Sequence, residues 1–178
     1  WLTRDAPSLD LHAAFGHAMV LLLLFRVAWG FLGSEPARFE SFVTGPAAAW
    51  AYLRATLAHI APRFIGHNPA GGWSVVVMIA LALAVLSTGM ALMSAQFALG
   101  ALGGGIAPSA GLWLRPLHEG LAWAMLALVG VHLVGVAWSS RSHRENLVAA
   151  MLTGFKTRVP ASAPAVPRHA ALAAGVLL

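Results

Sequence analysis

Long runs of apolar residues, separated by short polar segments, dominate this chain and predict a membrane protein. Three runs are long enough to cross the hydrocarbon core of a bilayer, which takes about 20 residues of α-helix. They cover residues 11–32, 73–93 and 116–138. Trp29, Trp73 and Trp138 lie near the ends of these runs, where the bilayer interface favours an amphipathic ring. The pattern therefore predicts an all-α integral membrane protein.

The segments between the runs have patterns of their own. Residues 46–60 form an amphipathic stretch whose large apolar side chains recur at helical spacing, and we predict that it lies on the membrane surface. Those side chains are Trp50, Leu53, Leu57 and Ile60. The sequence HNPAGG, residues 67–72, is expected to break the chain before the second run. Residues 94–115 are rich in Gly and Ala and predict a loop.

The ends of the chain differ from this central region. Residues 1–158 form the predicted membrane domain, and residues 159–178 form a Pro/Ala linker followed by the start of a further span. The first ten residues carry no positively charged signal region. We therefore expect that another helix precedes this sequence.

Composition narrows the chemistry that the chain can perform. Of 178 residues, 59% are hydrophobic and only 10% are charged, whereas soluble domains average about 25% charged residues. The absence of cysteine excludes disulfides, iron–sulfur clusters, thiolate zinc sites and thioether-attached haem. Eight histidines make imidazole the leading candidate for a metal ligand. No catalytic triad, paired-carboxylate site or phosphate-binding loop is found in the sequence.

The basic residues indicate topology rather than nucleic-acid binding. The net charge is +5, but no compact basic run with interleaved aromatic residues occurs. Eight basic residues lie in the loop between the first two runs or after the third run, namely Arg38, Arg54, Arg63, Arg141, Arg144, Lys156, Arg158 and Arg168. The opposite side carries Arg4 and Arg115. This asymmetry predicts that the long loop and the C-terminal segment are cytoplasmic.

Two histidines lie fourteen residues apart in the third run, LHEGLAWAMLALVGVHLVGV. Fourteen residues of α-helix rise about 21 Å and complete nearly four turns, so His118 and His132 share almost one face. This spacing is typical of two metal centres at different depths, and haem iron suits apolar surroundings because neutral imidazoles ligate it. The alternative is that each histidine forms hydrogen bonds with neighbouring helices or lines a polar cavity. Zinc is less favoured, since a closed site needs about four ligands at one depth.

The first run contains a histidine that can pair with His118 at the outer of the two predicted metal centres, the one on the side opposite the cytoplasm. His12 begins this run at a depth similar to that of His118, so an axial pair of the two is geometrically reasonable. Gly16, one turn later, would give a porphyrin room against the backbone. Arg26 shares the face of His12 near the inner leaflet, where it either pairs with a haem propionate or extends toward the cytoplasm. His17 points elsewhere and is interpreted as a hydrogen-bonded histidine and a reserve ligand.

The inner centre is less complete in this sequence. His132 has no clear partner of matching depth, although His67 could reach inward from the cytoplasmic side. A more economical expectation is that the partner of His132 lies on the preceding helix. His67 and Asn68 are weaker candidates for a polar site beside the inner centre, near a quinone.

Taken together, four segments of the chain resemble the bacterial cytochrome b561 family, which includes the b-type cytochrome subunits of nickel–iron hydrogenases. The segments are LHAAFGHAMVLLLLFRVAWGFLGSEPARFESFV, GHNPAGGW, LHEGLAWAMLALVGVHLVGV and HRENLVAAMLTGFKTR. They span most of residues 11–158, in the order that the family shows. The combination is specific, whereas GHNPAGG alone would be weak.

The resemblance implies an integral membrane helical bundle of the dihaem cytochrome b type, in the bacterial inner membrane. Its two b haems have bis-histidine ligation, and the family's ligands fall on His12, His118 and His132. The fourth ligand of the family belongs to a helix that precedes this sequence, so the inner haem lacks a visible fourth ligand here. The family passes electrons between a quinone pool and a redox partner, here expected to be a periplasmic c-type cytochrome or hydrogenase-like subunit.

Three functions remain open at the level of the sequence. The first is an electron-transfer subunit, which is not a catalyst by itself. The second is a membrane anchor of a respiratory complex that conducts no electrons. The third is a haem oxidoreductase that reduces quinone on its own.

Overall fold

The computed structural model describes residues 8–62, 64, 67–97, 105–142 and 146–149, and every regular element in these ranges is a helix. The elements are α1 (Leu9–Leu32), the 3₁₀ helix η2 (Glu35–Ala37), α2 (Phe39–Phe42), α3 (Pro46–Leu57), α4 (Pro69–Phe97), the 3₁₀ helix η3 (Pro108–Ala110) and α5 (Gly111–Ser142). This confirms the all-α fold class. The predicted linker and further span, residues 159–178, lie outside the described residues.

The helices α1, α4 and α5 are the three described helices that are long and apolar enough to cross a membrane. They contain 24, 29 and 32 residues and include the ranges predicted from the apolar runs. Their large apolar side chains are mostly exposed; Leu22 and Leu133, for example, are each 61% exposed. A protein that faced water on these surfaces would leave a large apolar area unpacked, so this distribution fits contact with lipid.

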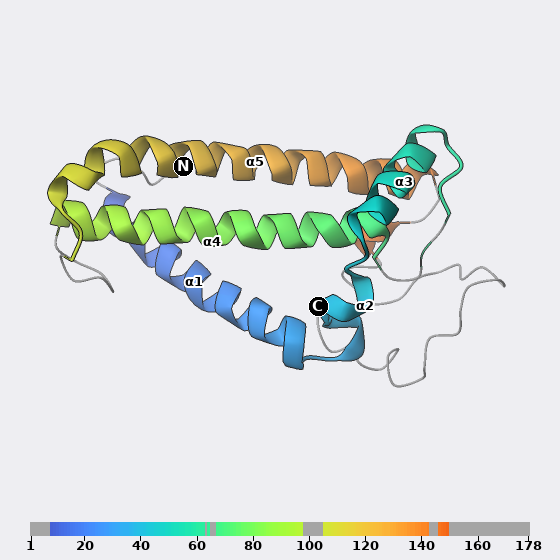
Figure 1. Cartoon of the computed structure of the whole chain (residues 1–178), viewed down its shortest axis with the longest axis horizontal. Helices are drawn as coiled ribbons and strands as arrows, with labels where there is room; N and C mark the ends of the chain where they lie inside the picture. Colours follow the sequence, from blue (N-terminus) through green and yellow to red (C-terminus); the bar gives the residue numbers. More distant parts are fainter. Residues whose placement is uncertain (1–7, 63, 65–66, 98–104, 143–145, 150–178) are drawn as a thin grey trace. The chain divides into compact units, whose positions relative to one another are not determined.

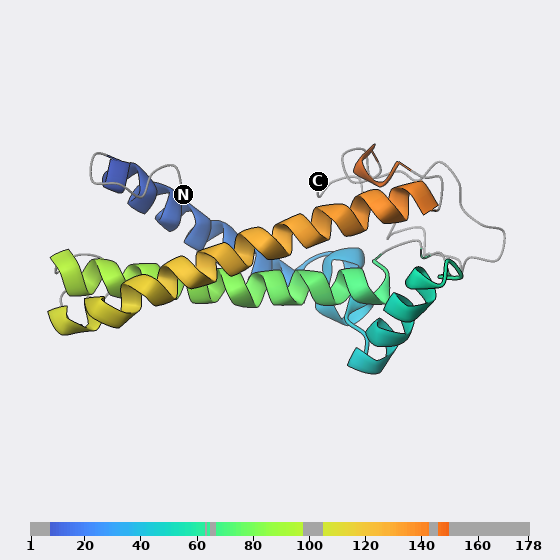
Figure 2. The same ribbon diagram turned by 90° about the horizontal axis from the view of Figure 1, so that it is seen from above.

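The chain divides into two compact units, which we describe separately. The first unit comprises residues 1–27 and 78–128. In this unit the start of α1, the end of α4 and the start of α5 lie at one end, where residues 78–97 and 111–128 lie next to each other and cross at an angle (Figures 1 and 2). Ser94 and Ala95 of α4 and Leu114 of α5 are buried there.

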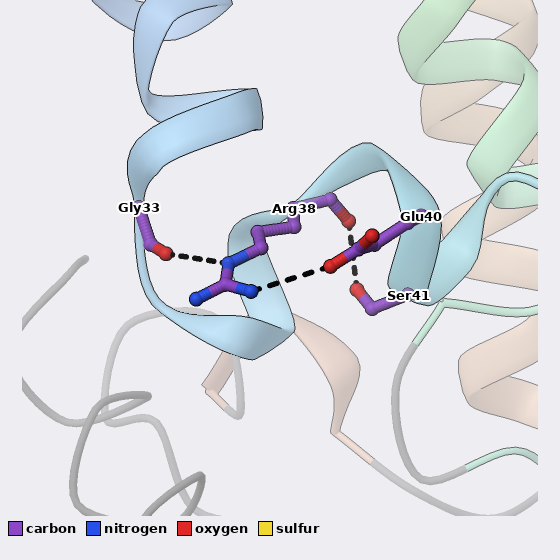
Figure 3. Close-up of polar contacts among 4 residues, drawn as sticks. All are labelled: Gly33, Arg38, Glu40 and Ser41. Carbon is purple, nitrogen blue, oxygen red and sulfur yellow. Dashed lines mark hydrogen bonds and ion pairs between the residues drawn. The ribbon is translucent and has the colours of Figure 1, made fainter.

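The second unit comprises residues 28–77 and 129–178. It contains the turn after α1, where the Arg38 side chain contacts both Gly33 before it and Glu40 after it in the sequence (Figure 3). Arg38 Nε donates to the Gly33 carbonyl oxygen at 2.9 Å, and its guanidinium pairs with Glu40 at 3.3 Å. The Ser41 hydroxyl donates to the Arg38 carbonyl oxygen at 2.7 Å. The first contact gives the Gly33 carbonyl oxygen, just after α1, a side-chain donor, and the Ser41 hydroxyl adds a second donor to the Arg38 oxygen, which also accepts from the Ser41 N–H at 3.1 Å.

Helix α4 begins inside the sequence HNPAGG, where a break was predicted. That prediction is wrong for residues 69–72, because α4 starts at Pro69. The Asn68 side-chain oxygen accepts from the Gly71 backbone N–H at 2.7 Å, which is the contact of an N-cap residue. Proline at the first helical position needs no N–H donor, so it starts the helix without loss. A Cβ at Gly72 would collide with the Phe42 carbonyl, so glycine is required for this close approach.

Helix α3 buries a different face from the one that the sequence emphasises. Ala49 and Tyr52 are buried in the second unit, and the Tyr52 ring packs edge-on against Phe64 with centroids 5.7 Å apart. The predicted stripe stays exposed, with Trp50 58% and Leu57 79% accessible. An exposed apolar stripe is what a helix on a membrane surface presents to lipid.

Candidate functional site

The first unit brings His12 of α1 and His118 of α5 together. Their ring centroids are 6.2 Å apart, and the ring planes lie at 80° to each other. Two imidazoles on opposite sides of one metal ion would place their centroids about 6 Å apart, since each metal–nitrogen bond is about 2 Å long. Each ring can rotate about its metal–nitrogen bond, so nearly perpendicular planes are compatible with axial ligation. Both side chains are half-buried.

The neighbouring helix α4 holds the His118 ring at one nitrogen. His118 Nδ1 lies 3.0 Å from the Val85 carbonyl oxygen and 3.2 Å from Thr88 Oγ1. Val85 and Thr88 are three residues apart and lie on the same face of α4. Together their contacts orient the ring and give Nδ1 a hydrogen-bonding partner. Hydrogen bonds of this kind commonly fix a metal-ligating imidazole.

A glycine of α4 makes room for the same ring. A Cβ at Gly89 would lie 3.0 Å from His118 Cε1, closer than side chains normally pack. Glycine at this position therefore lets the imidazole lie directly against the backbone of α4. Glu119, beside His118 in the sequence, pairs instead with Arg115 one turn earlier, at 3.5 Å.

In the second unit, α4 makes an equivalent contact with the other histidine of α5. His132 Nδ1 lies 3.2 Å from the hydroxyl oxygen of Ser74. The Ser74 hydroxyl in turn donates to the Gly71 carbonyl oxygen at 2.7 Å. The half-buried His132 therefore has a polar partner within the apolar span.

Other predicted site residues of the first unit lie along α1. Arg26 is half-buried. A Cβ at Gly16 would meet open space, so this face of α1 is unfilled in the chain itself. His17 Nδ1 lies 2.7 Å from the Ala13 carbonyl oxygen, which agrees with the interpretation of His17 as a hydrogen-bonded histidine.

The weaker candidates, His67 and Asn68, lie in the second unit just before α4. The His67 ring lies 4.8 Å from the ring of Phe42, centroid to centroid, and it is exposed. Asn68 is occupied by its capping contact with Gly71. A polar site near quinone at these two residues stays a prediction.

The donor set fits haem better than a metal ion held by protein ligands alone. In the residues that the structure describes, no group of three or more His, Asp or Glu side chains comes close enough to hold a metal ion. Two imidazoles whose ring centroids lie 6.2 Å apart can supply two ligands, and a porphyrin would supply the other ligands of the iron. The pair His12 and His118, next to the open face at Gly16, therefore matches what a b-type haem requires from the chain.

Three residues of α4 were not identified from the sequence: Ser74, Thr88 and Gly89. Hydroxyl side chains are not haem ligands, and in apolar helices they often bond only their own backbone, so nothing in their residue type marks them as part of the site. One signal was available, because Ser74 and Thr88 are fourteen residues apart, the same spacing as His118 and His132. Matching spacings on two helices predict repeated contacts between them.

Comparison with known proteins adds one finding to this geometry. A family model described as prokaryotic cytochrome b561 matches residues 1–154. Searches of the curated proteins and of the solved structures found no significant match.

Proposed function

Since this chain belongs to the prokaryotic cytochrome b561 family, whose members transfer electrons in membranes through b-type haem, we propose that it carries electrons between a quinone pool and a periplasmic redox partner. The partner is a c-type cytochrome or a hydrogenase-like subunit, and the chain is an electron-transfer subunit rather than a catalyst by itself. It resides in the bacterial inner membrane, with the segment after α5 on the cytoplasmic side. The observation that carries this proposal is the pairing of the His12 and His118 rings at 6.2 Å.

His12 and His118 would hold the iron of one haem, and His132 would provide a ligand to a second. A b-type haem, when bound, supplies one-electron chemistry at its iron. Helices α1 and α5 provide the imidazoles, and α4 orients those of α5 through Thr88 and Ser74. Rigid helices keep these ligands in place when the charge of the site changes, which lowers the reorganisation that electron transfer requires.

Two residues of α1 have proposed roles beside the ligands. Gly16 leaves open space in which a porphyrin can approach the backbone. Arg26 is a half-buried cation in an apolar helix, and its positive charge suits it to attract a propionate carboxylate of the haem. On the cytoplasmic side, the exposed His67 is the proposed polar contact for quinone.

Reduction by quinol tests the proposed function. The full chain, purified with its haem and placed in lipid nanodiscs, is mixed with duroquinol, and haem reduction is followed by absorption. Each quinol releases two electrons and two protons, so two equivalents of haem are reduced per quinol oxidised. We expect rapid reduction in the wild type and a severalfold slower reduction in His67→Ala at unchanged haem content, with His59→Ala as the matched surface control.

The outcomes separate the competing functions. A protein whose haem is reduced by dithionite but not by duroquinol would contradict the quinone part of the proposal. A folded protein without haem would favour the membrane-anchor function. Continuous quinone turnover by this chain alone, without a periplasmic partner, would favour a self-sufficient oxidoreductase.

A further inference from the structure

Each of the two hydroxyl groups of α4 that contact a histidine lies closer to a backbone carbonyl oxygen of its own helix than to the imidazole, and this favours donation of its proton to that carbonyl. Thr88 Oγ1 lies 2.7 Å from the Ala84 carbonyl oxygen and 3.0 Å from that of Val85. Ser74 Oγ lies 2.7 Å from the Gly71 carbonyl oxygen. A hydroxyl has one proton and two lone pairs, so each oxygen, after donating to its own helix, can only accept from a further partner. Each hydroxyl therefore presents a lone pair to its histidine.

The backbone of α4 gives an independent constraint at His118. The Val85 carbonyl oxygen, 3.0 Å from His118 Nδ1, is an acceptor without any proton. This contact is favourable only when Nδ1 carries a proton, because two lone pairs at this distance repel each other. Thr88 and Val85 thus both select the neutral tautomer of His118 that is protonated at Nδ1.

The same selection operates at His132 through one group. Ser74 Oγ, with its proton directed to Gly71, accepts from His132 Nδ1 at 3.2 Å. Among the described residues, no hydrogen bond occupies the Nε2 atom of His118 or His132. In both rings the free lone pair is then on Nε2, which is the nitrogen available to a metal.

We propose that Ser74 and Thr88 are positioning residues that hold His132 and His118 in the Nδ1-protonated tautomer and leave Nε2 to ligate iron. This inference rests on the proposed function, since it assigns the nitrogen through which each ligand acts. The hydroxyl positions and the histidine positions share a spacing of fourteen residues on α4 and α5. Helix α4 thus fixes the tautomer of both histidines of α5, although it contributes no histidine itself.

The hydrogen bonds also influence the iron itself. A proton on Nδ1 that is shared with an acceptor makes the other nitrogen more basic, and a more basic ligand stabilises ferric relative to ferrous iron. Loss of an acceptor is therefore expected to raise the reduction potential. Thr88 shares His118 with the Val85 carbonyl, whereas Ser74 is the acceptor that the described residues provide for His132. Loss of the Ser74 hydroxyl should therefore raise the potential of the haem held by His132 more than loss of the Thr88 hydroxyl raises that of the haem held by His118.

The test uses the haem-loaded full chain labelled with ¹⁵N-histidine and reduced with dithionite, because low-spin ferrous haem is diamagnetic and permits NMR. We expect His118 and His132 to carry their protons on Nδ1 in the wild type. In Ser74→Ala, the His132 proton should exchange with solvent faster by severalfold to about tenfold, as expected for the loss of one hydrogen bond. Ser74→Thr retains the hydroxyl and should restore slow exchange.

A second readout addresses the pair of ligands within the first unit. Thr88→Val removes the acceptor at similar side-chain volume, and Thr88→Ser keeps it. We expect Thr88→Val to raise the midpoint potential of the haem held by His12 and His118, at unchanged haem content, whereas Thr88→Ser leaves the potential at the wild-type value. If Thr88 only stabilised the fold, the two variants could differ from the wild type in stability, but the potential would not rise in Thr88→Val alone.

The results that overturn the inference are distinct from those that overturn the proposed function. Protons on Nε2 of His118 or His132 in the wild type, or identical exchange and potentials in all four variants, would refute the positioning role while haem binding stands. Absence of haem from the folded wild type would refute the proposed function. The ¹⁵N spectra of that haem-free protein would still decide which nitrogen carries the proton.

Discussion

A histidine in a membrane-spanning helix costs free energy unless its polar atoms have partners. His118 and His132 meet this requirement at Nδ1 through α4, and His118 also faces His12. The imidazoles are thus satisfied at one nitrogen by the protein. The other nitrogen is available to a ligand.

Substitution of Gly16 tests whether a porphyrin approaches α1. Alanine at this position meets no atom of the chain and should stabilise the helix by about 0.5–1 kcal/mol. If the open space receives a porphyrin, Gly16→Ala should nevertheless lower haem content severalfold. Haem per chain is measured by the pyridine haemochrome method, with Gly120→Ala, which also meets open space, as the control. Equal haem content in the two variants would contradict the role of Gly16.

Substitution of Gly89 tests the close packing of His118 on α4. In Gly89→Ala the new methyl group would lie 3.0 Å from His118 Cε1, so the ring must move by a few tenths of an ångström to make room. We expect weaker haem binding and an altered low-spin electron paramagnetic resonance signal. A wild-type signal at full haem content would show that the ring does not rest on Gly89 in the loaded protein.

The sequence predicts the ligand candidates better than their surroundings. The spacing of His118 and His132, and the matching depth of His12, follow from helix periodicity and topology. The partners of these rings depend on how α4 is rotated toward α5, and the apolar pattern of α4 is nearly uniform around the helix. Ser74, Thr88 and Gly89 were therefore missed, although their positions in the sequence were plain.

At the scale of elements, the helix boundaries depend on specific capping contacts, which the overall composition of a segment does not reveal. The apolar runs predicted the centres of the three long helices. The start of α4 at Pro69 is not predicted, because Gly and Pro in HNPAGG suggest a break. The capping contact of Asn68 and the fixed backbone of Pro69 turn the same residues into a helix start.

Substitution of Asn68 separates its capping role from a role near quinone. Asn68→Ala removes the acceptor for the Gly71 N–H and should destabilise the protein by about 1 kcal/mol. In a chain of this size that corresponds to a decrease of roughly 2–4 °C in the midpoint of thermal unfolding. Asn68→Asp keeps the acceptor and should unfold at the wild-type temperature. Equal losses in the two variants would indicate that the amide nitrogen of Asn68 matters more than the cap.

At the scale of the whole molecule, the distribution of basic residues predicts which ends of the spans lie on the cytoplasmic side of the membrane. The basic residues of the loop after α1 and of the segment after α5 predict a cytoplasmic location for both. The sequence predicts this arrangement from charge alone, because positive residues near spans are retained on the cytoplasmic side.

The absence of cysteine gives a clean background for testing this topology. Single substitutions Ala47→Cys in α3 and Ser109→Cys in η3 place a thiol at exposed positions. In intact spheroplasts, a membrane-impermeant maleimide should label Ser109→Cys and leave Ala47→Cys unlabelled until the membrane is opened. The reverse pattern would contradict the assigned orientation.

The proposed function depends above all on a b-type haem held by His12 and His118. The most direct measurement is the reduced-minus-oxidised absorption spectrum of the purified protein, with haem quantified per chain, for the wild type, His12→Ala, His118→Ala and His17→Ala. We predict a b-type spectrum in the wild type, loss of one haem per chain in both His12→Ala and His118→Ala, and no change in His17→Ala. Full haem content in folded His12→Ala and His118→Ala variants would contradict the claim.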